Sequence, residues 1–105
     1  MSTVTIRLVI SEDDDAMIHQ LQRDYTTPFG EPSLNAIIRV LLTRGISSLT
    51  RRPLRDPHST LSVSRSFIIP RSLATLIQGR ADELGCTRSL MLRSALRNGA
   101  ESLRP

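Results

Sequence analysis

Apolar residues recur at every second position over residues 3–10, TVTIRLVI. Successive side chains of a β-strand point to opposite faces, so this pattern predicts a strand with one apolar face. The side chains expected to face a core are Val4, Ile6, Leu8 and Ile10. The opposite face would carry Thr3, Thr5, Arg7 and Val9.

The period then changes to that of a helix. Ser11 precedes the acidic run 12–15, and both features suit a helix N-terminus because they meet its free N–H groups and its positive dipole end. An apolar stripe continues to about Tyr25, where we expect this helix to end. The following segment 26–32, TTPFGEP, contains two prolines and a glycine and is expected to form a loop.

Two segments, SLNAIIRVLLTRG at 33–45 and TRSLMLRSALRNG at 87–99, repeat the same pattern at a constant offset of 54. Each opens with a hydroxyl residue that can cap a helix and closes with a glycine that can end one. The expected boundaries are Ser33 and Gly45 for one helix, and Thr87 and about Gly99 or a little beyond for the other. An internal repeat of this kind determines the architecture.

The segment before the second copy repeats the rest of the plan. Residues 62–69, SVSRSFII, resemble a strand, Pro70 suits the first turn of a helix, and Gly85 suits its end. We therefore expect two strand–helix–helix repeats joined by a linker, at residues 1–46, 47–61 and 62–105. A chain of about 45 residues buries too little surface to be stable alone, so the two repeats should share one core.

Charge separates the two halves of the chain. All 14 basic residues are arginine, and the net charge is +4. Residues 1–50 hold four arginines and six acids, a net of −2, whereas residues 51–105 hold ten arginines and four acids, a net of +6. A small arginine-rich protein suggests a polyanionic partner, although a solvated basic surface is the alternative.

Other features of the sequence set the expected compartment. Cys86 is the only cysteine, which excludes an internal disulfide and fits a reducing interior. The N-terminal residues lack the pattern of a signal peptide, and no apolar run approaches the length needed to span a membrane. We therefore expect a cytoplasmic protein without a membrane partner.

The segment IPRSL at 69–73, followed by GCTRS at 85–89 and an arginine-containing apolar helix, resembles the ribbon-helix-helix (MetJ/Arc) DNA-binding family. Residues 64–99 match that pattern, and residues 4–45 match it with a longer loop. The tandem arrangement is similar to the accessory proteins of conjugative and T-DNA transfer systems, including the TraY type. Together the two copies cover most of the chain.

The resemblance implies a mainly α fold with a two-stranded antiparallel β-ribbon, formed as an intramolecular pseudo-dimer. The family inserts its ribbon into the DNA major groove, where base edges carry a full donor and acceptor code. When Ile10 is aligned with Ile69, the residues expected to face the bases are Thr5, Arg7, Val9, Ser64, Ser66 and Ile68. Arg7 is the best single candidate because a guanidinium bonds guanine with two hydrogen bonds. Ordinary solvent-facing strand residues are the alternative for the others.

The resemblance also directs the N-termini of the second helices of both repeats toward DNA phosphates, since free N–H groups and the helix dipole suit an anion. The residues at these places are Ser33, Leu34 and Asn35 in the first copy, and Thr87, Arg88 and Ser89 in the second. Plain helix capping is compatible with this role. Further attraction to the backbone would come from Arg51, Arg52, Arg55 and Arg71.

Three other arginines are harder to place. Arg39 and Arg93 occupy the same place in the two copies, and we expect them to serve the helix surface or an internal carboxylate rather than DNA. Arg65 falls where Ile6 stands in the first copy, at a position that should face the core. Either it lies at the frayed end of the ribbon, or the register shifts by one and Arg65 contacts DNA.

Other classes of function fit less well. The acidic run 12–15 as a metal site, or His19 and His58 as catalytic groups, would need partners that the sequence does not offer, so we expect no enzyme, no metal and no cofactor. A filler role suits Cys86. A transcriptional repressor remains the leading interpretation. The alternatives are an accessory protein of a DNA-transfer complex, with protein partners and self-association on DNA, and an antitoxin that binds a toxin.

Overall fold

The computed structural model describes residues 2–49 and 60–103. Along the chain lie β1 (Thr3–Ser11), α1 (Glu12–Asp24), α2 (Leu34–Ser48), β2 (Leu61–Pro70), α3 (Arg71–Leu84) and α4 (Arg88–Leu103). The prediction of a mainly helical chain with one two-stranded antiparallel sheet is confirmed. Each strand extends beyond its expected bounds by one residue at one or both ends.

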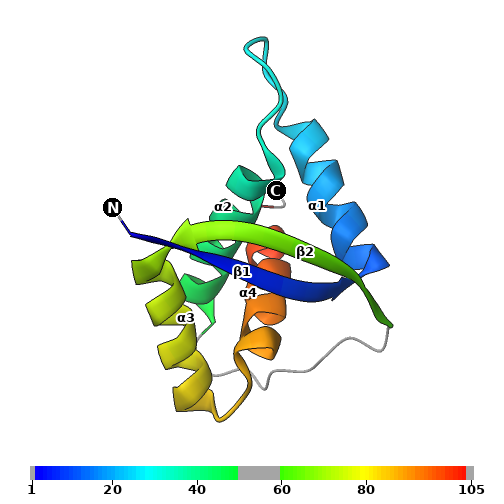
Figure 1. Cartoon of the computed structure of the whole chain (residues 1–105). Helices are drawn as coiled ribbons and strands as arrows, with labels where there is room; N and C mark the ends of the chain where they lie inside the picture. Colours follow the sequence, from blue (N-terminus) through cyan, green and yellow to red (C-terminus); the bar gives the residue numbers. More distant parts are fainter. Residues whose placement is uncertain (1, 50–59, 104–105) are drawn as a thin grey trace.

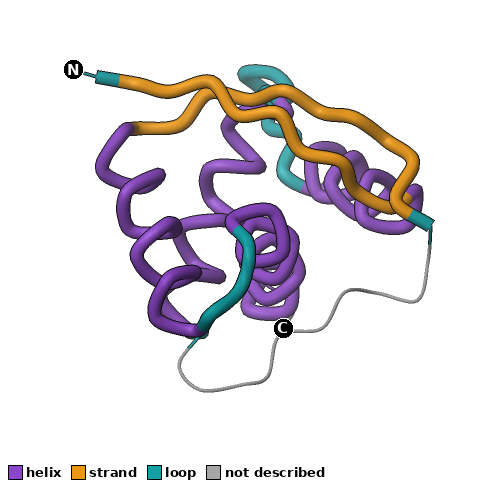
Figure 2. The backbone as a smooth tube through the Cα atoms, turned by 60° about the horizontal axis from the view of Figure 1, so that its bottom comes forward, coloured by secondary structure: helices purple, strands orange, loops and turns teal. Residues whose placement is uncertain are grey.

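The two strands form a ribbon that lies over the helices as a separate layer (Figures 1 and 2). They run antiparallel, from the pair Thr3 and Pro70 at one end to the pair Ser11 and Leu61 at the other. The register is regular except for an irregularity between Ile10 and Ser11. One face of the ribbon therefore meets the helices, and the other points away from them.

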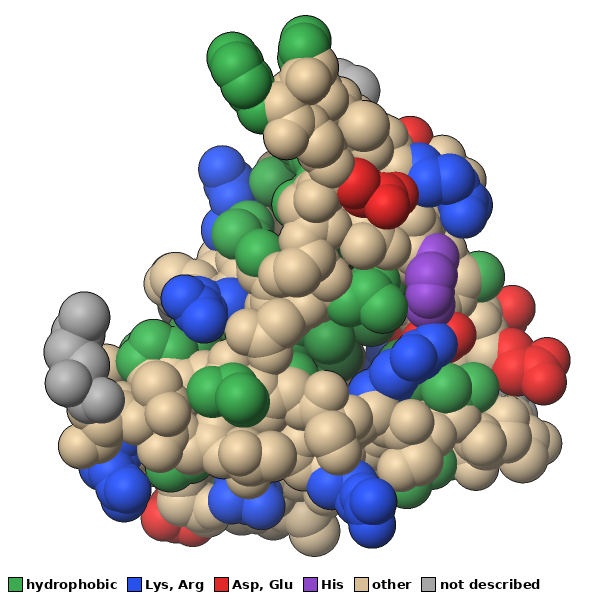
Figure 3. Space-filling model, turned by 45° about the horizontal axis from the view of Figure 1, so that its top comes forward, with side chains coloured by type: hydrophobic (Ala, Val, Ile, Leu, Met, Phe, Trp, Pro, Cys, Tyr) green, Lys and Arg blue, Asp and Glu red, His purple; other side chains and the backbone are tan. Residues whose placement is uncertain are grey.

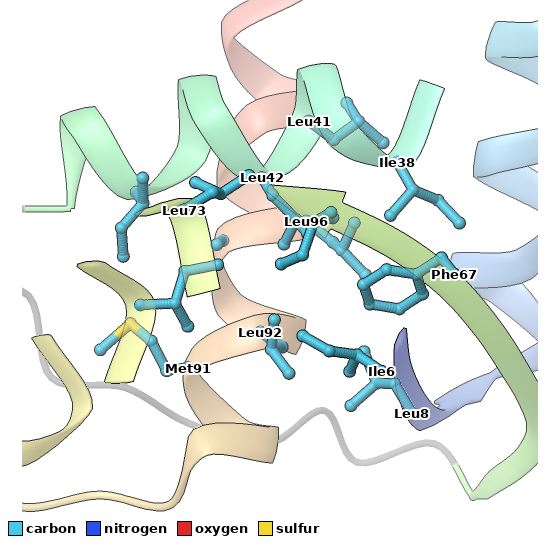
Figure 4. Close-up of a cluster of buried hydrophobic side chains, with 14 of the residues drawn as sticks. Ile6, Leu8, Ile38, Leu41, Leu42, Phe67, Leu73, Met91, Leu92 and Leu96 are labelled. Atoms are coloured by element: carbon cyan, nitrogen blue, oxygen red, sulfur yellow. The ribbon is translucent and has the colours of Figure 1, made fainter. Parts of the chain in front are cut away.

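The inner face of the ribbon and all four helices build a single core. The buried residues form one hydrophobic cluster drawn from both halves of the chain, and Figure 4 shows its centre. Ile6, Leu8 and Ile10 of β1 and Phe67 and Ile69 of β2 are buried, as the alternating pattern predicts, while Val4 is partly buried at the ribbon end. Neither half could bury these side chains without the other.

Local signals set three helix ends, the start of α1 and both ends of α3. The Ser11 side chain accepts a hydrogen bond from the Asp14 N–H at 3.1 Å, which confirms the predicted cap of α1. Pro70 is the last residue of β2 and the N-cap of α3 rather than a residue of its first turn. Gly85 ends α3 in the left-handed conformation, with φ of +67°, which a residue with a side chain adopts only at a cost.

The predicted end of α2 at Gly45 is wrong. The helix continues to Ser48, and the buried Leu49 is its C-cap. The expected linker 47–61 is correspondingly shorter, because its first two residues belong to α2 and Leu61 begins β2. Residues 50–59 of that linker lie outside the described part of the chain.

Gly45 instead lies where α2 meets α4. A Cβ placed on Gly45 would lie 2.6 Å from the carbonyl carbon of Ala95 and 2.9 Å from its Cα. A Cβ on Gly99 would lie 2.7 Å and 2.8 Å from the same two atoms of Leu41. Both glycines are therefore needed because the two helix backbones touch, and neither serves to end a helix.

Candidate nucleic-acid interface

The central part of the outer face of the ribbon, called the outer face below, consists of Thr5, Arg7, Val9, Ser64, Ser66 and Ile68. All six side chains are exposed, including the apolar Val9 at 41% and Ile68 at 46%. They lie in three directly opposed cross-strand pairs: Thr5 with Ile68, Arg7 with Ser66, and Val9 with Ser64. The structure therefore brings together, on one uncovered surface, all six residues that the sequence places there.

The chemistry of the outer face is mixed. It holds one guanidinium, three hydroxyl groups and two branched apolar side chains. A guanidinium donates two parallel hydrogen bonds, a hydroxyl donates or accepts, and an apolar group can pack against a methyl. Arg7 occupies the central pair, so the single cation lies in the middle of the face.

The two ends of the ribbon differ in charge. At the end where Ser11 and Leu61 pair, α1 begins with the exposed Glu12 and Asp13. At the opposite end, α3 begins with the exposed Arg71. A polyanion lying along the ribbon would be attracted at one end and repelled at the other.

The N-terminus of α2 is attached to the edge of the ribbon. Ser33 caps the helix by accepting a hydrogen bond from the Ala36 N–H at 3.1 Å, as predicted. The Asn35 side chain bonds the backbone of Ile68 twice, donating to its carbonyl oxygen at 3.0 Å and accepting from its N–H at 2.6 Å. Leu34 is partly buried against the core, so it offers only its backbone to a ligand.

The N-terminus of α4 has a different arrangement. Thr87 accepts a hydrogen bond from the Leu90 N–H at 3.1 Å, which confirms its role as a cap, and Arg88 and Ser89 are exposed. Ser89 occupies the place of Asn35 in the repeat, so a shorter hydroxyl side chain stands where the first copy has an amide. Arg93, one turn later, donates to the carbonyl oxygen of Val9 at 3.4 Å instead.

Arg39 and Arg93 are therefore not equivalent. Arg39 is exposed on α2, as expected for a helix surface, whereas Arg93 is 7% exposed. One hydrogen bond of Arg93 goes to a backbone carbonyl of the ribbon, a partner that the sequence did not suggest. The anchoring roles of Asn35 and Arg93 were missed because the hydrogen-bond partners are backbone atoms, which leave no mark in a sequence.

Arg65 lies on the inner side of the ribbon, opposite the buried Leu8. Its guanidinium donates two hydrogen bonds to the Asp15 carboxylate of α1, at 2.7 and 2.9 Å. These hydrogen bonds lower the pKa of Asp15 and raise that of Arg65. Both expected explanations for Arg65 are therefore wrong, because the register does not shift by one residue and Arg65 lies within the ribbon rather than at a frayed end.

His19 and Cys86 belong to parts of the chain other than the ribbon. His19 is half-buried, and its Nδ1 lies 2.9 Å from the Asp15 carbonyl oxygen. Cys86 is partly buried against the core, and burial raises its pKa, which fits a filler. His58, Arg51, Arg52 and Arg55 lie outside the described residues. Within residues 2–49 and 60–103, no group of three His, Cys, Asp or Glu side chains is placed to hold a metal ion.

No family model, curated protein or solved structure matches the chain. No helix among the described residues is long and apolar enough to cross a membrane. Inferences about function therefore rest on the geometry and chemistry of the surfaces described above.

Proposed function

We propose that this protein binds double-stranded DNA sequence-specifically by inserting its β-ribbon into the major groove, and that it regulates transcription as a repressor. The observation that carries the proposal is the uncovered outer face, with Arg7 at its centre. A two-stranded β-ribbon has the width that the major groove admits. The net charge of +4 adds attraction to the phosphate backbone.

The proposal includes a tandem ribbon-helix-helix pseudo-dimer, and the pairing of the strands supports it. The repeat alignment relates each β1 residue to the β2 residue 59 positions later. Arg7 pairs across the ribbon with Ser66, its own equivalent in the second repeat. The same offset relates the pair of Thr5 and Ile68 to the pair of Ser64 and Val9, as a two-fold axis through the ribbon requires. The helices agree, because the contact of Gly45 with Ala95 corresponds, at the offset of 54, to that of Gly99 with Leu41.

Phosphates would be held beside the ribbon by the helix N-termini. The first N–H groups of α2 and α4 have no partner inside their helices and suit an anion. The two hydrogen bonds between Asn35 and Ile68 fix the start of α2 against the edge of the ribbon. When the ribbon lies in the major groove, the N–H groups at the start of α2 would therefore lie near the phosphates of the DNA backbone. Arg71 and Arg88, both exposed, add charge at the starts of α3 and α4.

The bound site should be asymmetric. A true two-fold dimer would carry the same residue on both strands at its centre, whereas here Arg7 faces Ser66. The ribbon ends also differ in charge, with Arg71 at one end and Glu12 and Asp13 at the other. One orientation of the protein on DNA is therefore favoured, which suits a non-palindromic core site.

Selection of bound duplexes from a random pool, at near-physiological salt, tests the proposal. We expect a short enriched motif without inverted symmetry, and Arg7→Ala should then cost about 1–3 kcal/mol on that motif and less on random DNA. Arg23→Ala removes the same charge from an exposed position at the far end of α1 and is the matched control. Equal losses for the two variants, or the absence of any enriched motif, would contradict the proposal.

A further inference from the structure

The segment between α1 and α2 projects from the body of the protein (Figure 1). Its tip is a tight hairpin in which Thr27 and Gly30 exchange backbone hydrogen bonds of 2.9 and 3.0 Å. The Thr27 hydroxyl also accepts from the Phe29 N–H at 3.2 Å, and Gly30 adopts a φ of +126°. This ordered turn presents Phe29 with its side chain fully exposed, and Figure 3 shows apolar side chains at the tip.

The fold does not need this segment. In the second repeat, α3 and α4 are joined by residues 85–87 alone, whereas α1 and α2 are separated by residues 25–33. The longer connection also holds two of the three aromatic residues of the chain. Tyr25 and Phe29 are exposed there, whereas the third, Phe67, is buried in the core. An added segment that exposes aromatic side chains points to a binding role.

An apolar pocket lies at the foot of the same segment. It has a volume of about 350 Å³ and is lined by Tyr25, Pro32, Ala36, Ile37, Val40, Arg44 and Leu103. Its wall on α2 includes Val40, which is 45% exposed. The pocket is therefore open, mostly apolar, and large enough for an aromatic ring.

We propose that this pocket receives Phe29 of a second copy of the chain, and that two copies exchange their hairpins reciprocally. Phe29 stands at the tip of the segment, and the pocket borders the foot of that segment. Two copies related by a two-fold axis can therefore make both contacts at once, which closes the assembly as a dimer. Charge supports this occupant, because the exposed Glu31 of one hairpin would approach Arg44 at the partner's pocket. The proposal does not depend on DNA binding.

The expected dimer is weak. Each Phe side chain buries about 150–250 Å². The total surface area buried by two such contacts and the residues around them should stay below about 1,200 Å², which is typical of small, transient interfaces. The association should therefore appear only in a concentration series, and it should be reversible on dilution.

Two measurements without DNA test the proposal. Sedimentation equilibrium of the full chain should show a mass that rises from 11.7 kDa toward twice that value and no further. Tyr25 is the only tyrosine and there is no tryptophan, so intrinsic fluorescence reports on the pocket directly. Its emission should change over the same concentrations as the mass.

Phe29→Ser removes the aromatic side chain that enters the pocket, and Val40→Glu places a charged side chain in the pocket wall. Both side chains are exposed, so circular dichroism should show an unchanged fold, and both variants should stay monomeric with constant Tyr25 emission. Leu76→Ser, half-exposed on α3 and away from the pocket, is the matched control and should dimerise like the wild type. A monomeric wild type, a Phe29→Ser variant that still dimerises, or a mass that grows beyond the dimer would each overturn the proposal.

Discussion

Gly45→Ala tests the contact between α2 and α4. In an exposed helix, replacing glycine by alanine stabilises the protein by about 0.5–1 kcal/mol because the unfolded chain loses freedom. At Gly45, however, the new Cβ would lie 2.6 Å from the Ala95 carbonyl carbon, where ordinary contact begins at 3.4 Å. The carbonyl oxygen of Ala95 would lie closer still, so the helices would have to separate by clearly more than 0.8 Å.

The cost follows from what blocks the Cβ. The neighbouring atoms belong to the backbone of α4, so no change of rotamer can relieve the clash. Overpacking of this kind costs about 1–3 kcal/mol, and a backbone obstacle belongs at the upper end of that range. After subtraction of the gain in helix propensity, we expect Gly45→Ala to lower the free energy of unfolding by about 2 kcal/mol. For a chain of this size the melting temperature should fall by about 10 °C.

Urea and thermal unfolding followed by circular dichroism measure the effect. Gly79→Ala on α3 is the matched control, since no described atom lies within 4 Å of a Cβ built there, and it should raise stability. Opposite signs for the two variants support the reasoning. A neutral or stabilising Gly45→Ala would refute it. Because Gly99 lies in the same helix contact, the double variant with Gly99→Ala should lose less than the sum of the two single losses.

Three further results are expected. The pKa of Asp15 is lower in the folded protein than in the unfolded chain. The ion pair with Arg65 therefore stabilises the fold fully at pH values above the pKa of the unfolded chain. This stabilisation is lost as the pH falls through the pKa of the folded protein. Asp15→Asn should therefore cost about 0.5–1 kcal/mol at neutral pH and nothing in strong acid, by urea unfolding at both pH values. Asn35→Ala should cost about 1–2 kcal/mol and speed hydrogen exchange at the Ile68 amide, whereas Ser89→Ala, at the same place in the other repeat, should do neither. DNA affinity measured against salt should fall with a logarithmic slope of about −4 to −5, and a flat dependence would argue against phosphate contacts.

The period-2 pattern predicted the ribbon well because a strand that is buried on one face has apolar residues at every second position of its sequence. Every second residue of β1 had to be apolar to meet the helices, and Ile6, Leu8 and Ile10 are buried accordingly. The outer face followed from the same alternation. Sequence could thus place the candidate site before any helix packing was known.

Gly45 was misread because a glycine after an apolar stripe usually ends a helix. The stripe in fact continues beyond it through Ile46 and Leu49, which keep the helical spacing and are buried. That continuation was a signal against a helix end. Only the neighbouring helix explains why glycine is required at this position.

Arg65 was uncertain for a different reason. Alternation placed it inward, where an unpaired charge would be costly. Its partner Asp15 lies 50 residues earlier in the chain, on another element. A single sequence cannot pair residues across such a distance, so the choice between core, ribbon end and DNA needed the structure.

The attachment of Asn35 and Arg93 to the ribbon has a consequence for how the strands behave in a crowded cell. Both strands of a two-stranded sheet are edges, and their unpaired amides and carbonyls invite further strands to add. Asn35 occupies both groups of Ile68 on one edge, and Arg93 occupies the carbonyl of Val9 on the other. A further strand could pair with these backbone groups only after displacing the two side chains, so strand addition is disfavoured at one point on each edge.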